Sequence, residues 1–312
     1  MENLKILLVC SGRFALPVMR DLVYQRSLAA VIIPSFCKEM LEETQQLLQT
    51  TGIPVIQVNK QNHENELKKA IRKYDAAMVF MMTFRYKITK AVFDLPSKGF
   101  YNFHPGSLPE YRGADPIFMQ LKNQEKYAGV TVHKLDEGFD TGPIVIKEMI
   151  KIDASDTYGI LNNKLAELAS KLAGILIKMA AFDLAIPSKP QDETKAGYFT
   201  RQSSKEIVID WETMNAGAII SLVNACNPWN KGAVTSINNK IVRLLNVEKT
   251  ESEEAVTVLP GTVLSINESN LSVAVIGQHA LRINFIYIDE GFLRAGSLLN
   301  LGVRVGSKFQ NL

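Results

Sequence analysis

The chain has 312 residues, of which 46% are hydrophobic and 21% charged, and its formal net charge is +3. This length suits about two domains with full cores. The small net charge does not by itself argue for a nucleic-acid-binding protein, because such a protein usually shows clustered Lys and Arg. Three cysteines with no CxxC pair exclude a disulfide framework, so we expect a cytoplasmic protein. The longest apolar stretch, 172–187, contains Lys178 and Asp183, and we expect no membrane span.

The first third of the chain alternates apolar runs with helical patterns. Strands are predicted at 5–10, 28–35, 53–58, 75–82 and 99–104, and helices at 11–25, 40–52, 64–74 and 88–96. Apolar strands alternating with helices are typical of βαβ units and of a parallel sheet that is covered on both faces. The sequence therefore predicts an α/β, Rossmann-like, mostly parallel sheet.

The pattern changes in the second half. Two more strands are predicted at 128–136 and 142–152, followed by a long helix at 156–183. A polar stretch with two prolines and no periodicity follows, and short strands are then predicted at 233–237, 241–248, 261–267, 271–277 and 280–288. Five short strands separated by Gly and Asn turns indicate a small, OB-like β-barrel. We expect a catalytic domain at 1–184, a linker at 185–206 and a barrel domain at 207–312.

Asn102 and His104 end the predicted strand at 99–104. They are two residues apart, so their side chains point to the same face. In an open parallel sheet, sites form at the carboxyl ends of the strands. A polar pair on an otherwise apolar strand is costly unless it is hydrogen-bonded or functional, and the strand alone leaves both interpretations open.

A second polar stretch, LDEGFDTGPI, covers 135–144 and holds three acids between two predicted strands. Taken alone it is better explained as an acidic surface turn. A functional interpretation would bring one of its carboxylates against His104, where it would fix the tautomer of the imidazole and raise its pKa.

Together the two stretches, NFHPGSLPEYRGADPI and GVTVHKLDEGFDTGPI, resemble the folate-dependent formyltransferases. The segments IDW (209–211), NPW (227–229) and PGTV (260–263) are similar to landmarks of the C-terminal barrel of that family. The resemblance covers nearly the whole chain. It implies transfer of a formyl group from 10-formyltetrahydrofolate to a primary amine, with no metal required.

The resemblance also implies the site residues. The catalytic positions fall on Asn102 as oxyanion donor, on His104 as acid–base group or oxyanion stabiliser, and on Asp140, which would orient His104. The expected folate contacts are Gly106, Ser107, Leu108 and Pro109 after the predicted strand at 99–104, and Phe84, Tyr86 and Ile88 after the strand at 75–82.

The acceptor amine stays open between two classes. The length and the barrel favour the branch that formylates methionyl initiator tRNA. That branch usually carries a basic insertion after the second strand, whereas this chain has PSFCKEMLEETQQLLQ there, and residues 207–312 carry eight Lys and Arg against nine Asp and Glu, a net charge of −1. These features weaken tRNA binding and leave a nucleotide-linked amino sugar as the alternative. A non-catalytic or hydrolytic relative is disfavoured because all three catalytic positions are present.

Overall fold

The protein is described by a computed structural model that covers residues 4–312 except 229, 252–254, 256 and 278. It divides into two compact units, each described here by itself. The first comprises residues up to Gly113 together with Ala128–Ile150 and Asn162–Phe199. The second comprises Ala114–Tyr127, Lys151–Leu161 and Thr200–Leu312. The boundaries expected at 184 and 206 stay a prediction.

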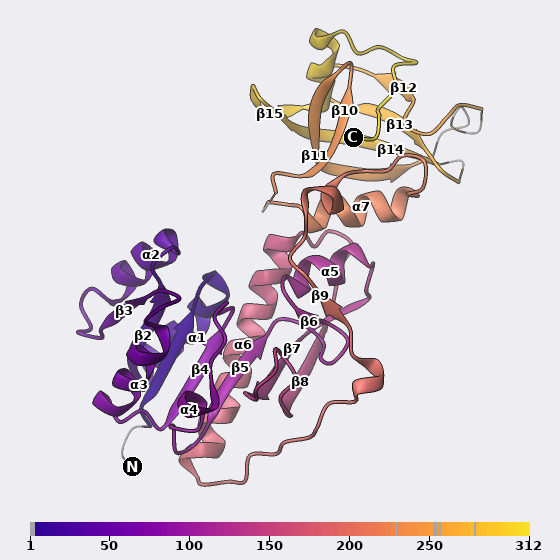
Figure 1. Cartoon of the computed structure of the whole chain (residues 1–312). Coiled ribbons are helices and arrows are strands. Elements are labelled where there is room, and N and C mark those ends of the chain that lie inside the picture. Colours follow the sequence, from indigo (N-terminus) through magenta and orange to yellow (C-terminus); the bar gives the residue numbers. More distant parts are fainter. Residues whose placement is uncertain (1–3, 229, 252–254, 256, 278) are drawn as a thin grey trace. The chain divides into compact units, whose positions relative to one another are not determined.

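The first unit is built on a seven-stranded sheet with the order β3-β2-β1-β4-β5-β7-β8, and Figure 1 shows β4, β5 and β7 side by side. The strands are β1 Ile6–Cys10, β2 Leu28–Pro34, β3 Val55–Val58, β4 Met78–Met82, β5 Phe100–His104, β7 Tyr127–Lys134 and β8 Ile144–Lys151. Strands β1 to β5 run parallel, and β7 pairs with β5 antiparallel. The predicted Rossmann-like, mostly parallel sheet is confirmed.

Helices follow the strands of this sheet in the predicted order. They are α1 Leu16–Tyr24, α2 Lys38–Leu48, α3 His63–Lys73, α4 Lys90–Phe93 and α6 Tyr158–Ala181. Leu67 and Ile71 of α3 and Val92 of α4 pack with Leu7 and Val9 of β1 in one apolar cluster. Every residue of β1 and β5 is buried. This is why β1 is apolar at consecutive positions, whereas β5 carries the polar residues Asn102 and His104.

The second unit contains the small barrel, drawn in orange and yellow in Figure 1. Its strands are β10 Ala233–Ile237, β11 Lys240–Thr250, β12 Val263–Ile266, β13 Leu271–Val275, β14 His279–Ile288 and β15 Gly291–Arg294, in the order β10-β11-β14-β13-β12 with β15 on β14. The C-terminal segment 307–310 closes the sheet: Gln310 exchanges backbone hydrogen bonds with Ser236 of β10, and Phe309 N–H donates to Gly261 O before β12. The predicted barrel is confirmed.

The sequence patterns missed two helices. They are α5 Pro116–Lys122 and α7 Ala216–Ala225, which contact each other within the second unit. Helix α7 is capped by Asn215, whose side chain accepts the Ala218 N–H at 3.0 Å. Its residues are mostly apolar, so it lacks the polar face that marks an amphipathic helix. Trp229, part of one barrel landmark, lies outside the described residues.

The stretch expected to be a linker carries ordered elements. They are η2 Glu193–Lys195, β9 Tyr198–Phe199 and η3 Ser204–Ile207. Strand β9 pairs with β6, Arg112–Gly113, in the first unit. Because both prolines and polar residues can belong to an ordered segment that uses side-chain hydrogen bonds, composition alone did not reveal this.

We expect Phe309→Ala to destabilise the barrel by about 3–5 kcal/mol, the usual cost of removing a buried aromatic ring. Phe309 is fully buried and stacks on Trp211 with ring centroids 5.4 Å apart. Both tryptophans of the chain, Trp211 and Trp229, belong to residues 207–312. Tryptophan fluorescence during urea unfolding therefore reports on this part of the chain. Lys308→Ala, at the exposed neighbouring position, is the control; an equal effect of both variants would contradict the packing argument.

Candidate functional site

Asn102 and His104 lie at the carboxyl end of β5, as expected. Both are buried, at 7% and 4% exposure, and they point to one face of the sheet. The antiparallel neighbour β7 places His133 opposite Asn102 and Thr131 opposite His104. Four polar side chains therefore share one face of two adjacent strands.

Asp140 comes from the loop between β7 and β8 and reaches this face. Its Oδ1 accepts a hydrogen bond from Asn102 Nδ2 at 3.1 Å, and its Oδ2 accepts the Gly113 N–H at 3.0 Å. The same Oδ1 lies 3.6 Å from His104 Nδ1 and 3.6 Å from His133 Nε2. The structure therefore brings all three predicted catalytic residues together.

The tautomers of both histidines follow from their partners. A carbonyl oxygen can only accept, so His104 Nε2 donates to Tyr111 O at 2.6 Å and His133 Nδ1 donates to Lys134 O at 2.8 Å. In the tautomer with its proton on Nδ1, His133 accepts at Nε2 from Asn102 Nδ2 at 3.0 Å. Because two acceptors face its nitrogen, the Asn102 amide has one favourable orientation. Because His104 Nε2 carries the proton, the unprotonated nitrogen of the neutral His104 ring is Nδ1.

Burial and the neighbouring groups set the charges. Burial lowers the pKa of His104, and the Asp140 carboxylate and the Tyr111 carbonyl offset only part of that effect. Burial alone would raise the pKa of Asp140, but interactions with His104 and His133 and the Gly113 N–H hold it well below its usual range. At neutral pH the cluster is a neutral imidazole beside a carboxylate, so His104 Nδ1 is able to accept a proton.

The loop after β5 is held in shape by side chains of β7 and β8. The Thr131 hydroxyl donates to Gly106 O at 2.7 Å and accepts the Leu108 N–H at 3.1 Å. Lys147 Nζ donates to Leu108 O at 2.8 Å, and Pro109 O accepts the Gly197 N–H at 3.0 Å. The loop is therefore a fixed surface at this end of β5.

Of the residues predicted to contact the folate, some are partly exposed at this edge of the sheet and others are buried in the packing beneath it. Ser107 Oγ donates to Glu110 at 3.2 Å, whereas the Leu108 side chain is fully buried. After β4, Phe84 and Tyr86 meet edge to face with ring centroids 5.3 Å apart. Ile88, at 3% exposure, belongs to the apolar cluster beneath them. Because β4 and β5 are parallel neighbours, the two segments leave the same edge of the sheet.

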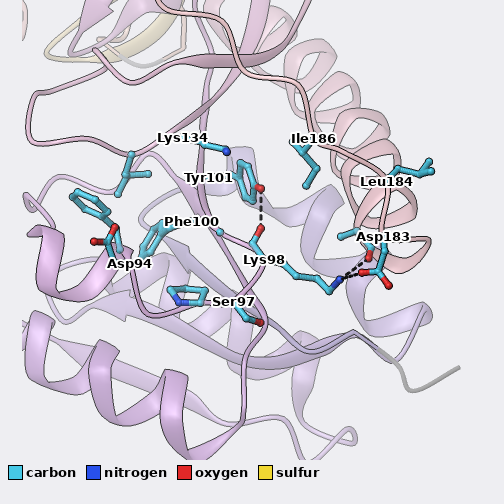
Figure 2. Close-up of a pocket in the computed structure, with 14 residues that line it drawn as sticks. Asp94, Ser97, Lys98, Phe100, Tyr101, Lys134, Asp183, Leu184 and Ile186 are labelled. Atoms are coloured by element: carbon cyan, nitrogen blue, oxygen red, sulfur yellow. Dashed lines mark hydrogen bonds and ion pairs between the residues drawn. The ribbon is translucent and has the colours of Figure 1, made fainter.

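Figure 2 shows a pocket of 480 Å³ at the other end of β5. Tyr101 OH donates to Lys98 O at 2.8 Å, and Lys98 Nζ donates to Ala180 O at 3.0 Å and is paired with Asp183. The pocket includes Gly99 and Phe100, at the amino end of the strand that carries His104 at its carboxyl end. Two lysines, Lys98 and Lys134, line the pocket, and Lys98 is paired with Asp183. Because the pocket lies at the end of β5 away from His104, we do not place the reaction in it.

Sequence reasoning missed His133, Thr131 and Arg112. The first two alternate on 128–136, and assigning that strand as the antiparallel neighbour of β5 would have found them. Arg112 is fully buried and bonded to residues about 80 positions away along the chain, so no local pattern marks it. Within the described part of the chain, no group of three His, Cys, Asp or Glu side chains is placed to hold a metal ion, and no helix there could cross a membrane.

Two family descriptions match the chain. "Formyl transferase" matches residues 24–175, and "Formyl transferase, C-terminal domain" matches residues 202–291. A methionyl-tRNA formyltransferase of Kosmotoga olearia is 31% identical over 88% of this chain and 86% of its own length. One from Halothermothrix orenii is 32% identical over 76% of this chain and 75% of its own.

Solved structures share the fold at low sequence identity. The sugar 3N-formyl transferase WlaRD, crystallised with dTDP and 5-N-formyl-THF, superposes with a TM-score of 0.68 at 16% identity, covering 91% of this chain and 98% of its own. HypX from Aquifex aeolicus, in complex with tetrahydrofolic acid, gives a TM-score of 0.68 at 16% identity over 98% of this chain and 51% of its own. With both family regions and relatives above 30% identity over most of the chain, this protein belongs to the formyl transferase family.

Proposed function

We propose that this formyltransferase transfers the formyl group of 10-formyltetrahydrofolate to the methionyl amino group of initiator tRNA. The observation that carries the proposed chemistry is the convergence of Asn102, His104 and Asp140 at the carboxyl end of β5. The acceptor is supported by relatives named methionyl-tRNA formyltransferase, which are about 30% identical over most of the chain.

The proposed steps use atoms already described. The neutral amine attacks the formyl carbon, and the carbonyl electrons move to oxygen. One proton of the amine passes to His104 Nδ1, and the Asp140 carboxylate stabilises the imidazolium that forms. Asn102 donates to the oxyanion by exchanging one of its two present acceptors, His133 or Asp140. The electrons on the oxyanion then re-form the carbonyl as the C–N bond to folate breaks, and the folate nitrogen takes the proton from His104.

The carboxyl edge of the sheet has groups that fit a folate. Phe84 and Tyr86 offer aromatic faces after β4, and the loop Gly106–Pro109 offers peptide groups after β5. A flat heteroaromatic ring needs apolar faces and a few fixed polar groups at its edge. We therefore propose that the folate lies along these two segments.

One patch of the barrel supports an RNA acceptor despite the net charge of −1. Phe285 and Phe292, 49% and 67% exposed, stand opposite Arg294 and Tyr287 on β14 and β15. Lys231 Nζ lies 4.7 Å from the Tyr287 ring centroid. Exposed aromatic rings among cations are suited to stacking unpaired bases and contacting phosphates. We call these five residues the aromatic patch.

The alternative acceptor is a nucleotide-linked amino sugar. Residues 38–48 after β2 form the helix α2, with one lysine and three glutamates, in place of a basic insertion. Structural neighbours at 16–17% identity include WlaRD and a Helicobacter canadensis N-formyltransferase crystallised with folinic acid and dTDP-3-aminofucose. Formylation assays with charged initiator tRNA and with amino sugar nucleotides separate the two.

We expect Asn102→Ala, His104→Ala and Asp140→Ala each to lower kcat about 100-fold or more, the usual effect of removing an oxyanion donor or acid–base group. The measurement is formyl transfer from 10-formyltetrahydrofolate at saturating acceptor. Glu137→Ala, at an exposed position of the same loop, is the control and should keep full activity. Near-normal turnover in any of the three variants would remove that residue from the site.

The pH profile should report the lowered pKa of His104. The base must be neutral, so kcat/KM should fall as pH drops through a pKa below the ordinary 6.5. The Asp140 carboxylate raises the His104 pKa. Asp140→Asn should therefore move the acidic midpoint to lower pH in the residual activity. A midpoint that moves upward would contradict this assignment of His104 as base.

The acceptor is tested by binding of charged initiator tRNA at two salt concentrations. We expect Phe292→Ala to weaken binding by about 1–3 kcal/mol, the cost of losing one stacked base. Arg294→Ala should reduce the slope of log binding constant against log salt concentration by about one, the effect of losing one phosphate contact. Lys249→Ala, at an exposed position of β11, serves as the control for charge alone. No detectable tRNA binding at low salt, with formylation of an amino sugar nucleotide, would replace this acceptor with the alternative.

A further inference from the structure

The segment 189–199, called the strap here, belongs to the first unit and is hydrogen-bonded at both ends to other parts of that unit. Lys189 exchanges two backbone hydrogen bonds of 2.8 Å with Ile144 at the start of β8. At the other end, Gly197 N–H donates to Pro109 O at 3.0 Å, and Arg112 N–H donates to Gly197 O at 2.9 Å. Figure 1 shows β6 and β9 side by side at this end. The strap therefore runs from the loop of Asp140 to the loop that follows His104.

The approach at the second end is close enough to require glycine. A Cβ on Gly197 would overlap the Glu110 carbonyl, and a Cβ on Gly113 would overlap the Phe199 carbonyl. Gly113 also has φ +98°, in the left-handed region that favours glycine. This is the same Gly113 whose N–H donates to Asp140. Gly113 therefore contacts both the strap and the carboxylate of Asp140.

Arg112 fixes the orientation of the Gln191 amide. Its Nε and Nη2 donate to Gln191 Oε1 at 3.0 and 2.8 Å. A guanidinium has no acceptor, so the amide oxygen must face it and the amide nitrogen must face away. Glu193 accepts two more guanidinium hydrogen bonds at 2.8 and 2.6 Å, which balances the charge of Arg112, and Tyr198 OH accepts one at 2.9 Å.

The Gln191 nitrogen in turn holds the loop that carries Asp140. Nε2 donates to Asp140 O and to Gly142 O, both at 2.7 Å. Asp140 has φ +57°, a conformation that a non-glycine residue adopts at a cost of about 1 kcal/mol or more and that its surroundings must maintain. The two hydrogen bonds from Gln191 supply part of that support, one of them on Asp140 itself.

We propose that Gln191 is a positioning residue of the active site, which holds the backbone of Asp140 so that its carboxylate stays against His104 and Asn102. It acts through Asp140 and touches no reacting atom. Arg112 acts one step further out by orienting Gln191. The expected effect of Gln191 on kcat rests on the proposed function, whereas its expected effect on the protonation of His104 does not.

The groups that face His104 make the consequence measurable. They are Asp140 from the loop after β7, His133 from β7 and the Tyr111 carbonyl from the loop after β5. Only Asp140 is an anion, so loosening it withdraws stabilisation from the imidazolium. A strap that merely tethered the chain would leave this equilibrium unchanged.

The test is an NMR titration of the ligand-free full chain carrying isotope-labelled histidine. The chain has four histidines, so the His104 signals can be assigned from His104→Ala. In Gln191→Met, which keeps the side-chain length and loses the amide, we expect the His104 pKa to fall. With the formyl donor and acceptor, kcat should drop about 10- to 100-fold, as a displaced catalytic group costs. KM should change little, and the acidic midpoint should follow the NMR pKa.

Lys195→Ala is the matched control, because Lys195 is exposed on the same strap and pairs only loosely with Asp192 at 3.9 Å. It should leave the pKa and kcat unchanged. If Gln191→Met does not fold, Gln191→Asn, one methylene shorter, carries the test. An unchanged His104 pKa in the folded variant would overturn the proposal. A lowered pKa in a chain that formylates neither acceptor would support the positioning and refute the proposed function.

Discussion

The carboxylate of Asp140, whose side chain is 15% exposed, is the charge on which the site depends. Removing an anion from water is costly unless hydrogen bonds replace its hydration. Here one oxygen accepts from Asn102 and the other from the Gly113 N–H. These partners come from β5 and β6, so the carboxylate links these two strands with the β7–β8 loop. The position of each segment therefore depends on the others, and the side chains proposed for catalysis are arranged before any substrate arrives.

The same carboxylate explains why a depressed His104 pKa is compatible with proton transfer. Burial keeps the imidazole neutral, which is the form able to take a proton from an amine. The anion at 3.6 Å lies beside Nδ1, the atom that would receive that proton. Burial lowers the pKa of His104 and the Asp140 carboxylate raises it. Because these influences oppose each other, His104 can both accept the proton and release it. An imidazole without Asp140 would be a weaker base.

The sequence predicted the features that depend on neighbouring residues and missed those that depend on residues far apart in the chain. The period of two placed Asn102 and His104 on one face, and apolar runs located strands such as β1, in which every residue is buried. The antiparallel direction of β7 leaves no local signal, so His133 was missed although it stands opposite Asn102. Ile88, expected to contact the folate, lies before α4 and packs in the apolar cluster at 3% exposure, which its place in the sequence did not reveal. The strap is polar for a specific reason, since Gln191 and Glu193 surround a buried arginine.

The barrel shows why a net charge does not decide a partner. Its cations and acids nearly cancel, yet Lys231 and Arg294 lie among exposed aromatic rings on β14 and β15. Counterion release grows with the number of phosphates contacted, so a surface with few cations must gain its affinity from stacking. Stacking is tolerant of sequence, because every base has a π-face. An RNA acceptor held in this way would dissociate readily after formylation, because little long-range attraction would retain it.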